Sequence, residues 1–413
     1  MGLSTGYRGS HVLLSVLIGL GTFLDGYDLL NISIVLPFLV HFMRLTPEMQ
    51  GLLGTTTYIG GVFGALVFGV FSDLRGRRVA LLSDISFFLV SSFLSAFVTS
   101  PGQLLALRFL VGFGIGADIV SGPALLSEES PTPRRGLLLG VSLIMMPLGG
   151  LVSALLAHVF LTMGLPPGIL WRIILGAGAI PAAIVILLRS RLPESTRWLL
   201  RGAPGRRRMP FNEVWRGYWR MLIYSSAAWV GAGTTSIFTI FTPMLVALRG
   251  GGYGSMLGTV LLLWVFATLG ALLGSLMLDR VGRRILLMAS LIGLGIAFWY
   301  VAITYRTPGL EYSLSLAMFM TFLVVSGAYT VQTEVFPVEV KSLADGIAFS
   351  LNRIANFVFG ALTPMYLYVG LTTRYLGWVG VFVLIMAITA LFTGMETARK
   401  DLEEIERLTK GNS

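Results

Sequence analysis

The stretch at residues 69–78, which reads GVFSDLRGRR, returns in shortened form as DRVGRR at residues 279–284. The shared pattern is Asp-x-x-Gly-Arg-Arg, and each matched residue lies 206 positions after its counterpart. Three residues of a second loop recur at the same displacement: Glu128, Pro131 and Arg135 are matched by Glu334, Pro337 and Lys341. Two loops that match at one displacement indicate an internal duplication, so the chain is predicted to consist of two related halves.

The composition places most of the chain in a membrane. Of its 413 residues, 55% are hydrophobic and 12% are charged, whereas a soluble chain carries roughly 25% charged residues. Too few charges remain to cover water-exposed domains of this size. The chain has 0 Cys, which excludes a disulfide-stapled fold, a thiolate metal site and thiol catalysis.

Apolar stretches near the ~20 residues that a spanning helix needs occur twelve times. They begin near Val12, Gly51, Val79, Leu104, Gly136, Ile169, Met221, Met256, Ile285, Ser313, Gly346 and Val379. The first stretch has no Ala-x-Ala cleavage site, so we expect it to stay in the protein. The predicted fold is all-α and integral to the membrane, with twelve transmembrane helices arranged as two six-helix pseudo-repeats.

The net charge of +10 would also suit a nucleic-acid-binding protein, but the basic residues are unevenly placed. Nine of the arginines fall between Arg189 and Arg220, after the sixth stretch. With both termini in the cytoplasm, 23 of the 30 basic residues lie inside, five outside and two within spans, as the positive-inside rule requires. We therefore expect a multi-pass plasma-membrane protein that has cytoplasmic termini and binds no nucleic acid.

The duplication and the basic stretch divide the chain into four parts. We expect an N-terminal six-helix half at 1–190, a cytoplasmic basic linker at 191–216, a C-terminal six-helix half at 217–398 and a cytoplasmic tail at 399–413. In a parallel duplication of this kind, the substrate site lies between the halves near the middle of the bilayer.

The charged residues of the repeated loops are predicted to form a cytoplasmic gate. They would join the two halves when the cavity faces outward and separate when it faces inward. The alternative is that these charges only fix the topology, which accounts for the arginines but not for the acids and glycines that recur with them. The predicted gate residues are Asp73, Arg77, Arg78, Glu128, Arg134, Arg135, Glu194, Asp279, Arg283, Arg284, Glu334, Lys341 and Glu396.

Ionisable residues inside the predicted spans are few and costly, on the order of 2.5–3.5 kcal/mol each on insertion scales. Asp25 and Asp28 share one face of the first span. At ~1.5 Å per residue, Asp28 and Arg108 of the fourth span lie at the same depth of the bilayer. A carboxyl beside an arginine in a water-lined cavity can alternate between paired and protonated forms. These three residues, with Asp118 ten positions after Arg108, are the predicted proton-coupling site. A permanent structural ion pair is the alternative, and Asp84 is expected to be solvated at the inner edge.

Arg353 of the eleventh span has no acidic neighbour on its own helix beyond Asp345, two turns away. In a cavity such an arginine suits a carboxylate or phosphate, and the alternative is a side chain that reaches the inner interface. Aromatic residues of the second half could line a cavity for a ring-shaped solute, or else face lipid and fill packing gaps. The predicted substrate-binding residues are Arg353, Asn352, Trp229, Phe238, Trp264 and Tyr329.

With these motifs, the chain resembles the major facilitator superfamily over essentially its whole length. The sequence PESTR at 193–197 and the pair Glu396 and Thr397 are similar to the sugar-porter signatures, with Met395 where the second signature usually has Pro. The resemblance implies that Asp28 or Asp25 acts with Arg108 as the proton site, and that the charges of the inner loops form the gate.

Two other regions look closer to proton symporters of metabolites, aromatic acids and phosphate. These regions are LDGYD at 24–28 and the stretch 108–136 of the fourth span. The paired Gln residues that hold hexoses in sugar porters are missing from residues 227–243, and so is a further Asp of phosphate symporters in the seventh span.

The sequence therefore predicts a secondary active transporter that couples proton entry to uptake of a small organic solute, an organic anion such as a carboxylate, by alternating access. The alternatives are a proton-coupled sugar porter, a phosphate symporter, and a facilitator or exporter without proton coupling. A membrane enzyme is disfavoured because no HExxH or Cys site occurs. We expect a monomer among membrane lipids, with no metal and no cofactor other than the coupling proton.

Overall fold

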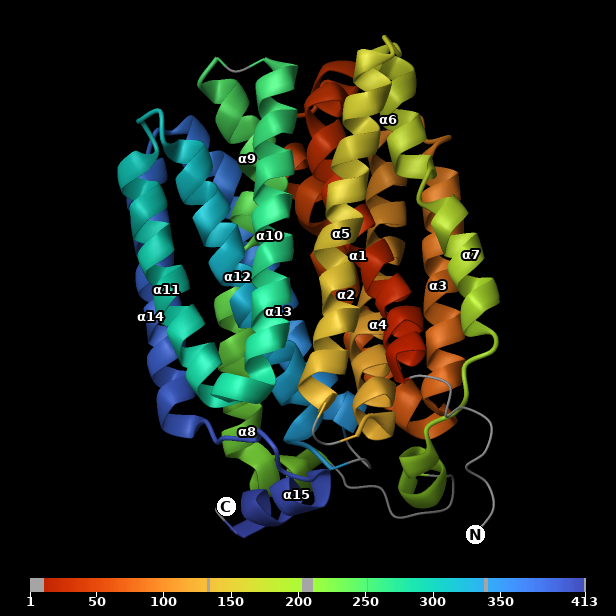
Figure 1. Ribbon diagram of the computed structural model, residues 1–413. Coiled ribbons are helices and arrows are strands. Elements are labelled where there is room, and N and C mark those ends of the chain that lie inside the picture. The colour runs from red at the N-terminus through yellow and green to blue at the C-terminus, as the bar shows by residue number, and fades with distance from the viewer. Residues whose placement is uncertain (1–10, 132–133, 203–210, 251, 338–340, 412–413) are drawn as a thin grey trace.

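The computed structural model describes residues 11–131, 134–202, 211–250, 252–337 and 341–411. Its long helices stand roughly parallel in one bundle, with the earlier helices on one side and the later ones on the other (Figure 1). Parts of the predicted linker and of both termini, 203–210, 1–10 and 412–413, lie outside the described residues. The first side contains α1 (His11–Met43), α2 (Pro47–Arg75), α3 (Arg77–Ser95), α4 (Pro101–Glu129), α5 (Arg135–Thr162), α6 (Pro167–Gly176) and α7 (Ala179–Arg189).

The second side repeats this order and adds one short helix at the end of the chain. Its helices are α8 (Phe211–Ala232), α9 (Ser236–Leu248), α10 (Tyr253–Val281), α11 (Arg283–Thr304), α12 (Leu310–Glu334), α13 (Lys341–Tyr368), α14 (Thr372–Thr393) and α15 (Leu402–Gly411). The pairs α6–α7 and α8–α9 each form a single span that is interrupted by a few residues.

The predicted all-helical membrane fold is confirmed. Among the described residues, eleven helical spans are long and apolar enough to cross a membrane. The twelfth, α13, runs beside them and carries Asn352, Arg353 and Asn356 in its middle. The outer surface of the bundle bears large apolar side chains, such as Ile303 at 72% and Phe392 at 75% exposure, which suits contact with lipid rather than water.

Local sequence signals place the helix ends. Thr46 and Ser100 each accept a hydrogen bond from the backbone N–H three residues later, and a proline follows each cap, so α2 and α4 begin there. Gly76 and Gly282 separate α2 from α3 and α10 from α11 with φ of 101° and 103°. This left-handed backbone is easily adopted only by glycine, which explains why the glycine of the repeated motif recurs.

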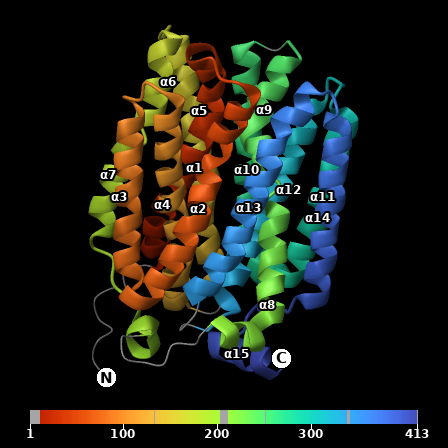
Figure 2. The same ribbon diagram turned by 180° about the vertical axis from the view of Figure 1, so that it is seen from behind.

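The two sides of the bundle meet along two helix pairs. Helix α5 lies beside α10 (Figure 1), and α2 lies beside α13 (Figure 2). Within each side the helices approach closely through glycines: a Cβ on Gly64 would collide with the Phe113 carbonyl of α4, and one on Gly270 with the Phe319 carbonyl of α12.

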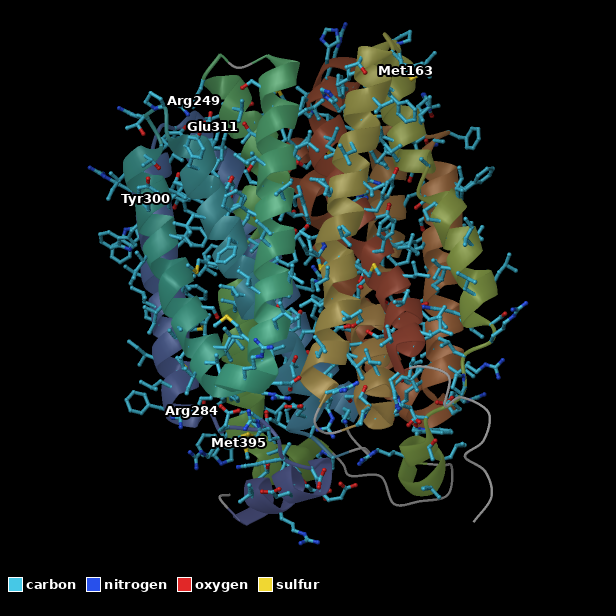
Figure 3. The ribbon with its side chains drawn as sticks, viewed as in Figure 1. Met163, Arg249, Arg284, Tyr300, Glu311 and Met395 are labelled. Carbon is cyan, nitrogen blue, oxygen red and sulfur yellow. The ribbon has the colours of Figure 1, made fainter. Side chains whose placement is uncertain are left out.

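One end of the bundle collects the repeated arginine loops and α15, and we call it the basic end. Arg284 and Met395 lie at this end, whereas Met163 and Arg249 lie at the other, which we call the opposite end (Figure 3).

Candidate functional site

Arg77, the first residue of α3, is fully buried at the basic end. Its guanidinium lies 2.7 Å from the Asp73 carboxylate and 3.1 Å from that of Glu128 in α4. It also donates to the Ser72 carbonyl at 3.0 Å. Burial of this charge is therefore offset by three charge-assisted or backbone contacts.

Arg283 repeats these contacts in the second half. It lies 2.8 Å from Asp279 and 3.2 Å from Glu334, and it donates to the Leu278 carbonyl at 3.1 Å. The internal repeat read from the sequence is thus a repeat of a three-dimensional contact set.

Glu194 and Glu396 cap the helices that these arginines begin. Glu194 accepts hydrogen bonds from the backbone N–H groups of Arg77 and Arg78 at 2.8 and 3.2 Å. Glu396 accepts from the first two N–H groups of α11 at 2.9 and 3.1 Å. A carboxylate at a helix N-terminus satisfies free donors and interacts favourably with the helix dipole.

The hydroxyl residue after each capping glutamate binds the acid that pairs with the arginine. Ser195 donates to Glu128, and Thr397 donates to Glu334 at 2.6 Å. Each segment that follows a last span is thereby fastened to the fourth span of its own half.

The aspartate of each repeated motif also joins the two halves. Asp73 of α2 accepts a hydrogen bond from the Leu343 N–H of α13 at 3.0 Å. Asp279 of α10 accepts one from the Leu137 N–H of α5 at 2.9 Å. These equivalent contacts hold both helix pairs of the interface together at the basic end.

A third cross-half contact differs between the copies. Arg135 of α5 lies 3.6 Å from the Glu334 carboxylate, whereas its counterpart Lys341 donates to the Ser127 hydroxyl at 3.3 Å. Arg134 is exposed beside them.

Arg78 and Arg284 make their hydrogen bonds outside this interface. Arg78 donates to the carbonyl of Ser190, which follows α7, at 2.7 Å. Arg284 donates to the carbonyl of Leu391, near the end of α14, at 2.9 Å.

Arg108 and Asp28 lie together inside the bundle, as their depths predicted, but the described residues show no direct ion pair between them. Arg108 donates to the Asp28 backbone carbonyl at 2.9 Å and to the Asn31 carboxamide at 3.2 Å. The Asp28 carboxylate accepts from the Asn31 amide at 2.9 Å and from the Ser92 hydroxyl at 3.4 Å. Asn31, one turn after Asp28, therefore stands between carboxylate and guanidinium.

Asp118 lies in a different cluster, centred on Arg189 at the end of α7. The Arg189 guanidinium is 2.5 Å from Asp118 and 3.6 Å from Asp84 of α3. It also donates to the carbonyls of Leu17 and Ile18 in α1 at 3.1 and 2.7 Å. We call Arg189, Asp84 and Asp118 the Arg189 cluster.

Two expectations about this cluster are corrected. The sequence places Arg189 in the basic stretch after the sixth span and predicts a solvated Asp84, yet both residues are fully buried. The reason is geometric: α7 continues to Arg189, and Gly21 leaves a gap in the surface of α1 that the guanidinium fills. Asp84 lies two turns inside α3, facing that gap.

Asp25 lies between this cluster and the second half. It is 1% exposed, and neither of its oxygens has a hydrogen-bond partner among the described residues. The charges that act on it include Asp118, Arg353 and Arg189. A buried carboxyl without hydrogen-bond donors is a candidate proton-binding group.

A cavity of about 50 Å³ lies between the halves, near the middle of the bundle, and we call it the central cavity. That volume admits a few water molecules, so entry of a larger solute requires the lining to move. The predicted residues Arg353, Asn352, Trp229 and Trp264 line it. The lining residues that the sequence did not single out include Tyr58, Phe349, Thr235, Thr321 and Asn356. Asp25 and Asp28 are not among the lining residues.

Arg353 is the one charged residue in this described lining. Its guanidinium carbon lies 4.3 Å from the Phe349 ring centroid and 5.3 Å from that of Tyr58, a cation–π arrangement. The side chain is 5% exposed, and it makes no ion pair or hydrogen bond with the described residues. A buried guanidinium of this kind is a ready binding group for an anion.

The other predicted substrate residues divide into two groups. Asn352 donates to the Trp229 carbonyl at 2.6 Å and faces the cavity with it. Phe238 and Tyr329 do not line the cavity, which corrects that expectation. Phe238 stacks on Phe298 with ring centroids 4.7 Å apart, and the Tyr329 hydroxyl lies 3.3 Å from that of Ser142. Both rings fill the packing between helices.

The break between α8 and α9 opens onto the same cavity. Asn356 of α13 accepts hydrogen bonds from the Ser236 N–H at 3.0 Å and from the Thr235 hydroxyl at 3.4 Å, and the Ser236 hydroxyl donates to the Asn356 carbonyl at 2.8 Å. Backbone groups that the break would leave free are thus satisfied by α13.

A larger cavity, of about 270 Å³, lies toward the opposite end between α1, α2, α9 and α13. Its lining includes Ser33, Gln50, Pro243 and Tyr368. The bundle is therefore tied together at the basic end and more open beyond the central cavity at the opposite end.

Comparison with known proteins agrees with this architecture. A sequence model described as the Major Facilitator Superfamily matches residues 18–360. An inner membrane metabolite transport protein of Escherichia coli is 30% identical, covering 83% of this chain and 82% of the relative. An arabinose-proton symporter of Bacillus subtilis is 25% identical over 97% of this chain and 95% of the relative. The proton:xylose symporter XylE, an E. coli protein, superposes with a TM-score of 0.85 at 19% identity, covering 97% of this chain and 100% of its own. The predicted transporter class is confirmed, and the XylE likeness bears on the fold alone.

Proposed function

Because the chain belongs to the major facilitator superfamily, whose members here are transporters, we propose that it couples proton entry to the uptake of a small organic anion by alternating access. The basic end would face the cytoplasm of the cell membrane, since its loops hold most of the arginines. The protein would act as a monomer with the proton as its coupling ion.

The observation that carries the proposal is Arg353. A guanidinium buried in hydrocarbon surroundings and left without a counter-ion is costly, and the cost is offset when a solute supplies the negative charge. Phe349 and Tyr58 hold the guanidinium in place, while Trp229 and Trp264 offer apolar faces beside it. A carboxylate joined to a compact organic body matches this combination.

The contacts at the basic end support the alternating-access step. With both Asp73–Leu343 and Asp279–Leu137 contacts formed, the basic end would be closed and a solute would enter the central cavity from the opposite end. Opening toward the cytoplasm requires these contacts and the Arg135–Glu334 contact to separate together. The predicted gate residues would thus act as a latch between two rigid halves.

Proton coupling would act through the charge of Asp25. While Asp25 is ionised, its negative charge opposes the approach of an anion to Arg353. A proton on Asp25 removes that charge, so the anion and the proton bind together. Asp28 and Arg108, nearer the opposite end, would lie on the proton's entry path. Asp118 would connect Asp25 to Arg189.

A proton-coupled sugar porter is the second candidate. The carboxamides of Asn352 and Asn356 and the hydroxyls of Thr235 and Thr321 line the central cavity and can hydrogen-bond a polyol. The arabinose-proton symporter among the relatives favours the same substrate class. Under this alternative, binding would survive the substitution Arg353→Gln.

Transport in proteoliposomes tests the proposal. A thermal-shift screen of purified protein against monocarboxylates, sugars and inorganic phosphate first identifies a solute that stabilises it. An inward proton gradient should then drive at least tenfold accumulation of that solute. Asp25→Asn should abolish the accumulation and retain solute exchange, because exchange needs no net proton movement. Glu311→Gln, at the opposite end, is the matched control and should behave as the parent protein does. Accumulation that is indifferent to pH and to Asp25→Asn would refute proton coupling.

A further inference from the structure

Asp345 is a buried acid that the proposed transport cycle leaves unused. It lies in the second turn of α13, on the helix face that also carries Lys341 and Asn352. It is 0% exposed, and neither carboxyl oxygen has a hydrogen-bond partner within the described ranges. On this face, Asp345 lies between Lys341 at the basic end and Asn352, which lines the central cavity.

The charged groups that act on Asp345 come from four helices. They are Lys341 on α13, Asp73 on α2, Arg77 on α3 and Glu128 on α4. The cations among them are already engaged: Lys341 with Ser127, and Arg77 with both acids. Three carboxyls thus face two cations, so a charged Asp345 would be the surplus negative charge in a space closed to water.

The duplication shows that this carboxyl is not needed to build the interface. The position that corresponds to Asp345 in the first half, 206 residues earlier, is Leu139, which is also fully buried. By contrast, the contacts of Asp73 and Arg77 are matched by those of Asp279 and Arg283 in the other half. Leucine fills this buried position in one half, so the acid in the other half is not required for packing. This difference indicates that the acid serves a chemical function.

We propose that Asp345 is a second proton-binding site, which holds a proton while the basic end is closed and releases it to the cytoplasm when that end opens. This inference rests on the proposed alternating access. Separation of α13 from α2 and α4 would bring water to the carboxyl and stabilise its charged form. The proton then leaves on the cytoplasmic side, opposite to the side from which the transported proton entered. Its departure favours the open arrangement. Opening should accordingly become easier as the pH rises.

A single thiol placed at the interface reports this opening. The chain has 0 Cys, so Ser342→Cys introduces the one reactive group. Ser342 is fully buried beside α2, and a maleimide reaches it only when the basic end opens. The labelling rate is measured on purified protein in nanodiscs and divided at each pH by the rate for the unfolded protein. This ratio is free of the intrinsic pH dependence of thiol reactivity.

The expected result is a normalised labelling rate that rises with pH, by at most tenfold per unit for one released proton. In the Ser342→Cys background, Asp345→Asn should reduce this dependence to less than twofold, whereas Asp345→Glu should keep it with a shifted midpoint. Asp345→Leu, which installs the residue of the first half, should match Asp345→Asn and serves if the amide variant folds poorly. Glu311→Gln should leave the dependence unchanged.

A parent protein without pH-dependent labelling, or an Asp345→Asn variant that retains the full dependence, would overturn the inference. The measurement uses no solute and no gradient, so it is independent of proton-driven uptake. Labelling of the parent protein that does not depend on pH, with intact proton-driven accumulation, would therefore refute the role of Asp345 alone. Labelling that depends on pH through Asp345, without proton-driven accumulation, would refute the proposed symport alone.

Discussion

The two halves of the chain are nearly identical at the basic end and unlike in the middle. Arg77 and Arg283 bind equivalent acids at distances that agree to 0.1 Å. In the middle, the first half buries the Arg189 cluster with Asp25, whereas the second half places Arg353 alone against aromatic rings. Under the proposed transport cycle, the duplicated part would serve a motion that both halves share. The unlike parts would divide the chemistry, with Asp25 as the coupling acid in the first half and Arg353 as the solute-binding group between the halves.

The largest expected effect is a difference in the free energy of unfolding between variants of the two arginines buried inside the bundle, Arg189 and Arg353. Arg189→Leu removes the counter-ion of Asp84 and Asp118 and leaves two carboxyls buried without a cation. We expect a loss of about 3–5 kcal/mol in the free energy of unfolding. Arg353→Leu removes a cation that has no counter-ion among the described residues, so stability should change by about 1 kcal/mol or less, while stabilisation by the anionic solute should disappear.

Denaturant unfolding of both variants in one detergent measures this contrast, with Arg374→Leu at the exposed opposite end as the control. Equal losses for Arg189→Leu and Arg353→Leu would contradict the division of roles. Retention of solute stabilisation by Arg353→Leu would favour the sugar-porter alternative.

An intermediate effect tests the likeness of the two copies. Glu194→Gln and Glu396→Gln each keep the shape of the capping side chain and remove its charge at a helix N-terminus. Each should lower the free energy of unfolding by about 1 kcal/mol, and the two losses should match within about 0.5 kcal/mol. Unfolding curves of the single variants measure both values. A loss in only one of the two variants would show that the caps differ in energy although their geometry is equal.

The smallest effect is expected where the halves meet at the surface. Arg197 and Glu403 lie 2.7 Å apart, but their side chains are 29% and 42% exposed. Exposed pairs of this kind contribute about 0.2–1 kcal/mol. A double-mutant cycle of Arg197→Gln and Glu403→Gln should give a coupling energy in that range that falls as salt is added. A coupling above about 2 kcal/mol would contradict the assignment of this pair as a weak, exposed contact.

The sequence predicted the basic-end contacts well because one displacement relates both copies, so that Asp73, Glu128 and their counterparts could be identified together. It also placed Arg353 correctly in a cavity between the halves, because a charge inside an apolar span is rare. It missed the Arg189 cluster, since Arg189 is 105 positions from Asp84 and 71 from Asp118, and no spacing pattern connects residues on different helices. Phe238 was misplaced for a related reason: an aromatic ring on a membrane helix carries no signal that separates cavity from packing.

The break between α8 and α9 has a consequence for how a solute is trapped. The outer piece, Ser236–Leu248, is only 13 residues long, and its first N–H is held by Asn356, three positions from Arg353 on α13. Under the proposed cycle, a displacement of α13 on solute arrival would be transmitted to this short helix through that contact. The entrance could then be sealed by a tilt of α9 without movement of a whole half, so that capture would be faster than the subsequent reorientation of the halves.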